Sequence, residues 1–79
     1  MITKEAADSH IRCLLRNKIG ENMYEYTYNG YNIRAFYENG EVRFKITNSE
    51  GVVIKNFVVS TEAELANQLM KMTMYFTHS

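Results

Sequence analysis

The chain has 79 residues, of which 46 % are hydrophobic, and this is enough for one small folded domain but not for two. Nine basic and nine acidic side chains leave no net charge, which argues against a dedicated nucleic-acid binder, because such proteins rely on a surplus of Lys and Arg. With one cysteine, no apolar run as long as a secretion signal and none near the ~20 residues of a membrane span, we expect a single domain over residues 1–79 in the reducing cytoplasm, away from membranes.

Residues 4–18 have the period of an amphipathic helix. Apolar side chains recur there at spacings of three and four residues, with charged side chains largely opposite. Thr3 is suited to cap the first turn, and Gly20 is suited to end the helix in a left-handed conformation. The apolar stripe consists of Ala7, Ile11, Leu14 and Leu15.

Two Asn-Gly dipeptides, at residues 29–30 and 39–40, divide the middle of the chain. Asn-Gly accepts a positive φ at both central positions of a type I′ turn, so it is the strongest short-range signal for a β-hairpin. Residues 48–51, Asn-Ser-Glu-Gly, give a third turn. The predicted strands are residues 22–28, 31–37, 41–47 and 52–59.

A second helix follows the last predicted strand. Thr61, with Glu64 three residues later, fits a capping box. The apolar face of this helix consists of Leu65, Leu69, Met72 and Phe76. Together the elements predict an α+β domain of the order α-β-β-β-β-α, in which a four-stranded antiparallel meander has both helices packed on one face.

Two-residue turns fix the register of the meander, so the side chains that share a face can be read from the sequence. Tyr26 then lies opposite Ile33, and Ile33 lies opposite Ile46. Because two amphipathic helices need an apolar surface to cover, we expect this face to be the core, with tyrosine hydroxyls reaching water at its rim. Its members are Tyr24, Tyr26, Tyr28, Tyr31, Ile33, Ala35, Tyr37, Val42, Phe44 and Ile46.

The opposite face brings Glu25, Arg34 and Lys45 side by side and directs Phe36 away from the core. The strand over residues 52–59 is apolar on both phases, and the turn before it does not decide which phase faces inward. A sheet with one solvated face does not have such a pattern. An apolar patch ringed by Arg and Lys is typical of a protein-binding or self-associating surface, and an ordinary solvated face is the alternative. The candidate partner-binding residues are Arg34, Phe36, Arg43, Lys45 and Phe57.

Patterns typical of catalysis, or of metal or cofactor binding, do not emerge from the sequence. His10 and Cys13 lie three residues apart on the first predicted helix, but zinc needs further ligands, and the other histidine, His78, is next to the last residue. Cys13 has no base in its local unit, and neither a phosphate-cradling glycine loop nor a Ser-His-Asp order is present. We therefore expect a non-enzymatic protein without a metal or cofactor.

Residues 31–65 combine YNIRAFYENG with a basic-apolar strand, a turn glycine, a fourth strand and the spacing F-x-x-S-T-E-x-x-L from Phe57 to Leu65. This region, less than half of the chain, resembles the sheet-to-helix part of a family of small phage-encoded anti-CRISPR proteins that block type I-F surveillance complexes. The resemblance implies a non-catalytic inhibitor that occludes a partner's surface through its sheet. It adds Tyr37, in the YENG segment, to the candidate contacts.

The same region is similar in outline to the sheet-plus-helix modules of phage integrase arms, which lay a sheet in a DNA groove. That similarity implies DNA-facing roles for Arg34, Arg43 and Lys45, while the neutral net charge and Glu25 disfavour nucleic acid. We therefore expect a small protein-interaction module, encoded by a phage or another mobile element, that inhibits or regulates a host protein or protein complex. A homodimer is the other arrangement that such a surface favours.

Overall fold

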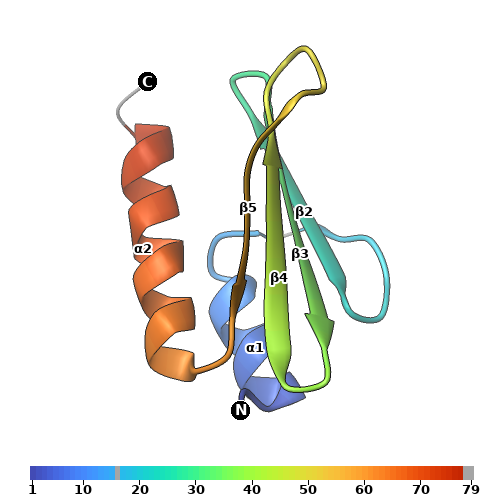
Figure 1. Cartoon of the computed structure of the whole chain (residues 1–79), viewed down its shortest axis with the longest axis vertical. Coiled ribbons are helices and arrows are strands. Elements are labelled where there is room, and N and C mark those ends of the chain that lie inside the picture. The colour runs from blue at the N-terminus through green and yellow to red at the C-terminus, as the bar shows by residue number, and fades with distance from the viewer. Residues whose placement is uncertain (16, 78–79) are drawn as a thin grey trace.

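The structure, a computed structural model, describes residues 1–15 and 17–77, the last four of these without their side chains (Figure 1). The fold is α+β, and the sheet is antiparallel with the strand order β1-β2-β3-β4-β5. Both helices lie on the same side of the sheet in Figure 1. The sheet has five strands where the sequence predicts four, because a short strand precedes the meander. The elements are α1 (Lys4–Ile11), β1 (Asn17–Lys18), β2 (Met23–Tyr28), β3 (Tyr31–Glu38), β4 (Glu41–Thr47), β5 (Val53–Val59) and α2 (Glu62–Thr77).

The register of β2, β3 and β4 is the one that the two Asn-Gly turns predict. Tyr26 pairs with Ile33, and Ile33 pairs with Ile46. Asn29 and Asn39 have φ values of 51° and 50°, and the glycine after each also has a positive φ, as a type I′ turn requires. The predicted division of the meander into two faces is therefore confirmed.

The core lies between the sheet and the two helices. Ile33, Ala35 and Phe44 on the sheet are all 0 % exposed, and both helices bury apolar side chains against this face. The tyrosines of β2 and β3 form core and core rim as predicted, since Tyr24 is buried and the other four pack against the core or sit at its rim. Two hydroxyls differ from the prediction, because Tyr24 donates to Asp8 and Tyr37 donates to the Ile2 carbonyl. The buried helix residues are Ala7, Ile11, Leu65, Leu69 and Met72.

Helix α1 ends at Ile11, earlier than the predicted end before Gly20. The backbone N–H groups of Leu14 and Leu15 both donate to the Ile11 carbonyl, at 3.0 and 2.7 Å, so the chain turns there. This turn delivers Leu15 into the core, where it is 0 % exposed, and lets β1 pair with the edge of β2. Burial and strand pairing override the helical spacing of these leucines, because local propensity is a weak preference.

Both helix starts agree with the sequence. The Thr3 hydroxyl accepts a hydrogen bond from the Ala6 N–H, and the Thr61 hydroxyl accepts one from the Glu64 N–H at 3.2 Å. Phe76, predicted on the inner face of α2, lies outside the residues whose side chains are described.

Candidate functional site

The face of the sheet opposite the helices is covered by no helix in Figure 1, and we call it the open face. Its side chains form rows across neighbouring strands because paired residues of an antiparallel sheet share a side. One row is largely apolar, and the row beside it is largely charged. The first row contains Met23, Phe36, Arg43 and Val58, and the second contains Glu25, Arg34, Lys45 and Asn56.

Four predicted site residues come together on the open face. Phe36 is half-buried in its row, flanked by Met23 on β2 and Arg43 on β4. Val58 continues this row onto the last strand and is 43 % exposed. Arg34 and Lys45 pair directly beside them. The result is a small apolar strip bordered by cations, an arrangement suited to a protein surface with apolar and acidic groups.

The cations of the open face differ in whether they are neutralised. Arg34 Nε donates to Glu25 Oε2 at 2.9 Å. Hydrogen bonds from Asn32 and then Arg34 hold the pKa of the Glu25 carboxyl below its usual value, although burial opposes this. Within the described part of the chain, neither Arg43 nor Lys45 forms an ion pair. These two side chains therefore carry charge that a partner could neutralise.

Two glutamates at one end of the open face were missed in the sequence reasoning. Glu38 and Glu41 lie directly opposite each other on either side of the Asn39–Gly40 turn. Like charges directly opposite each other are destabilising, so this pair of glutamates does not contribute to the stability of the fold. The Asn39–Gly40 turn sets the register of β3 and β4, so the sequence already predicts that Glu38 and Glu41 lie opposite each other. The glutamates line a shallow hollow of about 50 Å³ together with Phe36, Arg43 and Val58.

Phe57 and Tyr37 do not belong to the open face, and the grouping of Phe57 with Phe36 on one surface is wrong. Phe57 pairs with Phe44, and their rings stack at 5.1 Å between centroids on the helix side of the sheet. Tyr37 pairs with Val42 on that side, and its hydroxyl donates to the Ile2 carbonyl at 2.8 Å.

A β-bulge decides the orientation of the last strand. Ile46 pairs with Lys55 but the next residue, Thr47, pairs with Val53, so Ile54 is an extra residue. The bulge lets β5 present apolar side chains in both directions, with Phe57 inward. Val53, Ile54 and Val58 are each between 43 and 45 % exposed along this edge strand.

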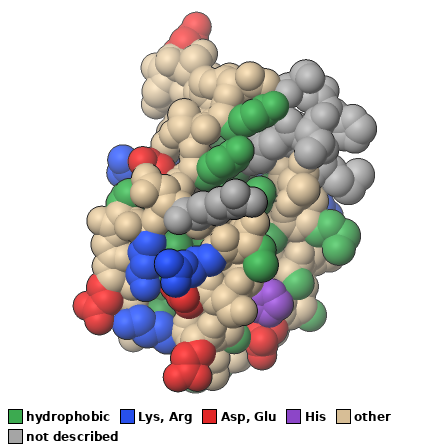
Figure 2. Space-filling view, turned by 180° about the vertical axis from the view of Figure 1, so that it is seen from behind, with side chains coloured by type: hydrophobic (Ala, Val, Ile, Leu, Met, Phe, Trp, Pro, Cys, Tyr) green, Lys and Arg blue, Asp and Glu red, His purple; other side chains and the backbone are tan. Residues whose placement is uncertain are grey.

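In the described surface around α1 and β1, Asp8 forms ion pairs with Lys18 and Arg12. Figure 2 shows Lys and Arg side chains gathered there among Asp and Glu. Asp8 lies 3.3 Å from Lys18 Nζ and 3.6 Å from Arg12, and it accepts a hydrogen bond from the Tyr24 hydroxyl. That hydrogen bond is the main cause of a lowered Asp8 pKa, while burial and Asp8 raise the pKa of Tyr24. This cluster fastens α1 to the sheet.

His10 and Cys13 have separate contacts. His10 Nε2 lies 3.7 Å from Glu62 Oε1, across the two helices, and Cys13 Sγ donates to the Ser9 carbonyl at 3.4 Å. Within the described residues, no group of three or more His, Cys, Asp and Glu side chains is placed to hold a metal ion.

No protein-family model, curated protein sequence or solved structure matches this chain. Among the described residues, neither helix combines the length and the apolar character needed to cross a membrane.

Proposed function

We propose that this protein is a non-enzymatic interaction module whose open face binds and occludes the surface of a protein partner. The observation that carries the proposal is the strip of Phe36 and Val58 on a sheet face without a helix. Arg43 lies between them and forms no ion pair with any residue that the structure describes. A residue of Phe36's size contributes nothing to the helix-side core from this position. Central aromatic and Arg side chains are the types that dominate binding energy in protein interfaces.

The charge distribution favours a protein over DNA. The open face carries three acidic side chains, Glu25, Glu38 and Glu41, against three basic ones. A phosphate backbone would meet repulsion at the Glu38–Glu41 end, whereas a protein surface can offer basic groups there and acidic groups opposite Arg43. DNA binding is the second candidate, favoured by Arg43 and Lys45 and disfavoured by the three glutamates of the same face.

The resemblance of residues 31–65 to phage-encoded inhibitors is the ground for proposing a host protein or protein complex in the cytoplasm as the partner. In this proposal the module acts by covering a functional surface and performs no chemistry. A second copy of the chain is the alternative protein partner of the same face.

Affinity capture from host lysate tests the proposal, with nuclease-treated lysate as a control for nucleic acid. The wild type should retain a defined set of proteins, and Phe36→Ser should lose them. Met70→Ser is a matched control, because Met70 is 64 % exposed on α2 and away from the open face. Equal retention by wild type and Phe36→Ser would contradict the proposal. If nuclease treatment abolished all capture, the result would contradict a protein partner and indicate that the open face binds nucleic acid.

Measurement of the salt dependence separates the two candidate partners further. A protein interface with an apolar centre should lose little affinity between low and moderate salt. Binding to DNA through several phosphates should weaken by orders of magnitude over the same range.

A further inference from the structure

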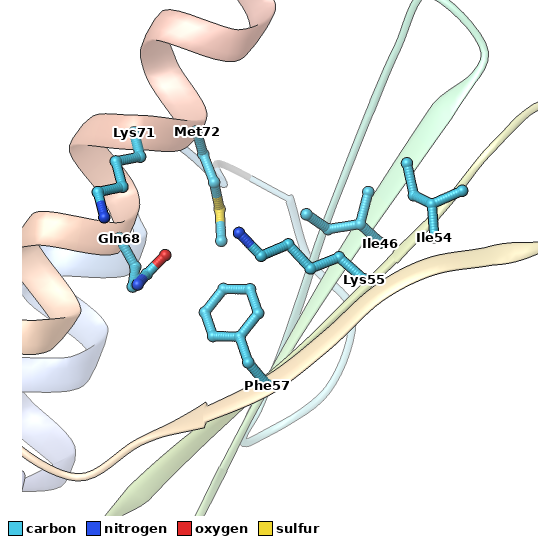
Figure 3. Close-up of a pocket in the computed structure, with 7 residues that line it drawn as sticks. All are labelled: Ile46, Ile54, Lys55, Phe57, Gln68, Lys71 and Met72. Atoms are coloured by element: carbon cyan, nitrogen blue, oxygen red, sulfur yellow. The ribbon is translucent and has the colours of Figure 1, made fainter.

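A groove on the other side of the sheet lies between α2 and the strands β4 and β5 (Figure 3). Its volume is about 230 Å³. The apolar part of its wall consists of Ile46, Ile54, Phe57 and Met72. In Figure 3, Phe57 from β5 and Met72 from α2 point toward one another across this space.

The β-bulge accounts for the groove. The extra residue places Ile54 and Lys55 next to each other at the wall, with Lys55 paired to Ile46. A lysine thus stands where a regular apolar alternation would put a large core side chain. Phe57 is fixed below it by stacking on the buried Phe44, at 5.1 Å between ring centroids. The floor is therefore rigid and aromatic.

The polar part of the groove is cationic. Lys55 Nζ lies 5.1 Å from the centre of the Phe57 ring, and Lys71 lines the groove from α2 together with the Gln68 amide. Neither lysine forms an ion pair within the described part of the chain, and no acidic side chain lines the groove. A ligand that combines an apolar group with an anion would bury its apolar group in the groove and give both lysines a negatively charged partner.

We propose that this groove binds a small amphipathic carboxylate: an aryl or short alkyl group that carries one carboxylate. The apolar group lies against Met72 and the edge of the Phe57 ring, since Phe44 and Lys55 lie over the faces of that ring. The carboxylate accepts hydrogen bonds from Lys55 and Lys71. The size agrees, since an apolar cavity of about 150 Å³ holds benzene and the groove offers about 230 Å³. The site is separate from the open face, so it does not rest on the proposed function.

Three probes separate the contribution of the apolar group from that of the carboxylate. They are 4-phenylbutyrate, its neutral analogue 4-phenylbutanol, and butyrate, which keeps the carboxylate without the ring. Titration of the ¹⁵N-labelled protein, followed by amide NMR, should give saturable shifts in residues 54–57 and 68–72. We expect phenylbutyrate to bind at least tenfold more tightly than either analogue. Equal affinity of the alcohol, or the absence of saturation in these residues, would overturn the proposal.

Lysine variants test the same point without disturbing the floor. Lys55→Gln and Lys71→Gln should each weaken phenylbutyrate binding severalfold and leave the affinity for phenylbutanol unchanged. Lys45→Gln, on the open face, is the matched control and should alter neither. All three lysines are exposed, so thermal melts should remain close to that of the wild type. Unchanged phenylbutyrate affinity in both groove variants would overturn the assignment of the carboxylate to the lysines.

Discussion

The two faces of the sheet are built from the same strands but have different surroundings. On the helix side, Ile33 and Phe44 are 0 % exposed, and two helices exclude water from them. On the open face, Phe36 is half-buried by its neighbours and Val58 is 43 % exposed. Strand alternation assigns a side chain to a face, but the helices determine which face becomes the core. The open face contributes no side chains to that core, so we expect changes there to cost less stability than changes on the helix side.

The largest effect should come from the helix side. Phe44→Ala removes a fully buried ring that stacks on Phe57, and we expect a loss of about 3–5 kcal/mol in the free energy of unfolding. For a domain of this size that is a large share of the total stability. Urea denaturation measures the change. A loss below about 1 kcal/mol would contradict the assignment of the core to the helix side of the sheet.

A smaller effect should follow from the attachment of α1 to the sheet. Tyr24→Phe removes the hydroxyl that donates to the Asp8 carboxylate, and hydrogen bonds to charged groups contribute about 1.5–3 kcal/mol. Tyr37→Phe is the matched control, since its hydroxyl donates to the neutral Ile2 carbonyl and should cost about 0.5–1.5 kcal/mol. Urea denaturation of both variants gives the order, and a reversed order would contradict the role given to Asp8.

The Asp8 cluster also predicts a dependence on pH. Its pKa is lowered in the folded state, mainly by the Tyr24 hydroxyl and also by Lys18, so the ionised form stabilises the fold. This contribution is present above the unfolded-state pKa, near 3.8, and is lost as the pH falls through the folded-state pKa. Asp8→Asn should therefore be less stable than the wild type at pH 7, and the difference should shrink at pH 3. A difference that is constant between these pH values would exclude this linkage.

The smallest effect on folding should come from the open face. Arg34→Ala breaks the 2.9 Å pair with Glu25, but the Arg34 side chain is 53 % exposed. Exposed pairs contribute about 0.2–1 kcal/mol, and salt screens them. We expect a loss in this range by urea denaturation, reduced further in high salt. A loss that salt does not reduce would indicate a structural role for Arg34.

The sequence predicts the central strands well because the local chemistry of their turns is decisive. Asn29-Gly30 and Asn39-Gly40 each permit one register, and from that register the composition of both faces follows. The side on which Phe57 lies could not be predicted in this way, because it depends on the bulge at Ile54. The early end of α1 depends on the burial of Leu15, which helical spacing alone does not reveal.

The candidate site was predictable to the same extent. The four open-face members follow from the Asn-Gly registers, and the same argument would have yielded Glu38 and Glu41. Phe57 was placed wrongly because apolar residues fill both phases of β5. Tyr37 is a candidate contact only because of the family resemblance. The Asn39–Gly40 turn places Val42 opposite it, and this pairing puts Tyr37 on the helix side of the sheet.

The most direct test of the central claim compares Phe36→Ser with Tyr26→Ser in thermal melts, each read beside its elution volume on a sizing column. Tyr26 packs against the core, so its truncation should cost about 2 kcal/mol and lower the Tm by roughly 10 °C. Phe36→Ser should melt within a few degrees of the wild type while it weakens partner binding or self-association. If Phe36→Ser melts the protein and Tyr26→Ser does not, the two faces are assigned the wrong way round, and the tyrosine face is the binding surface.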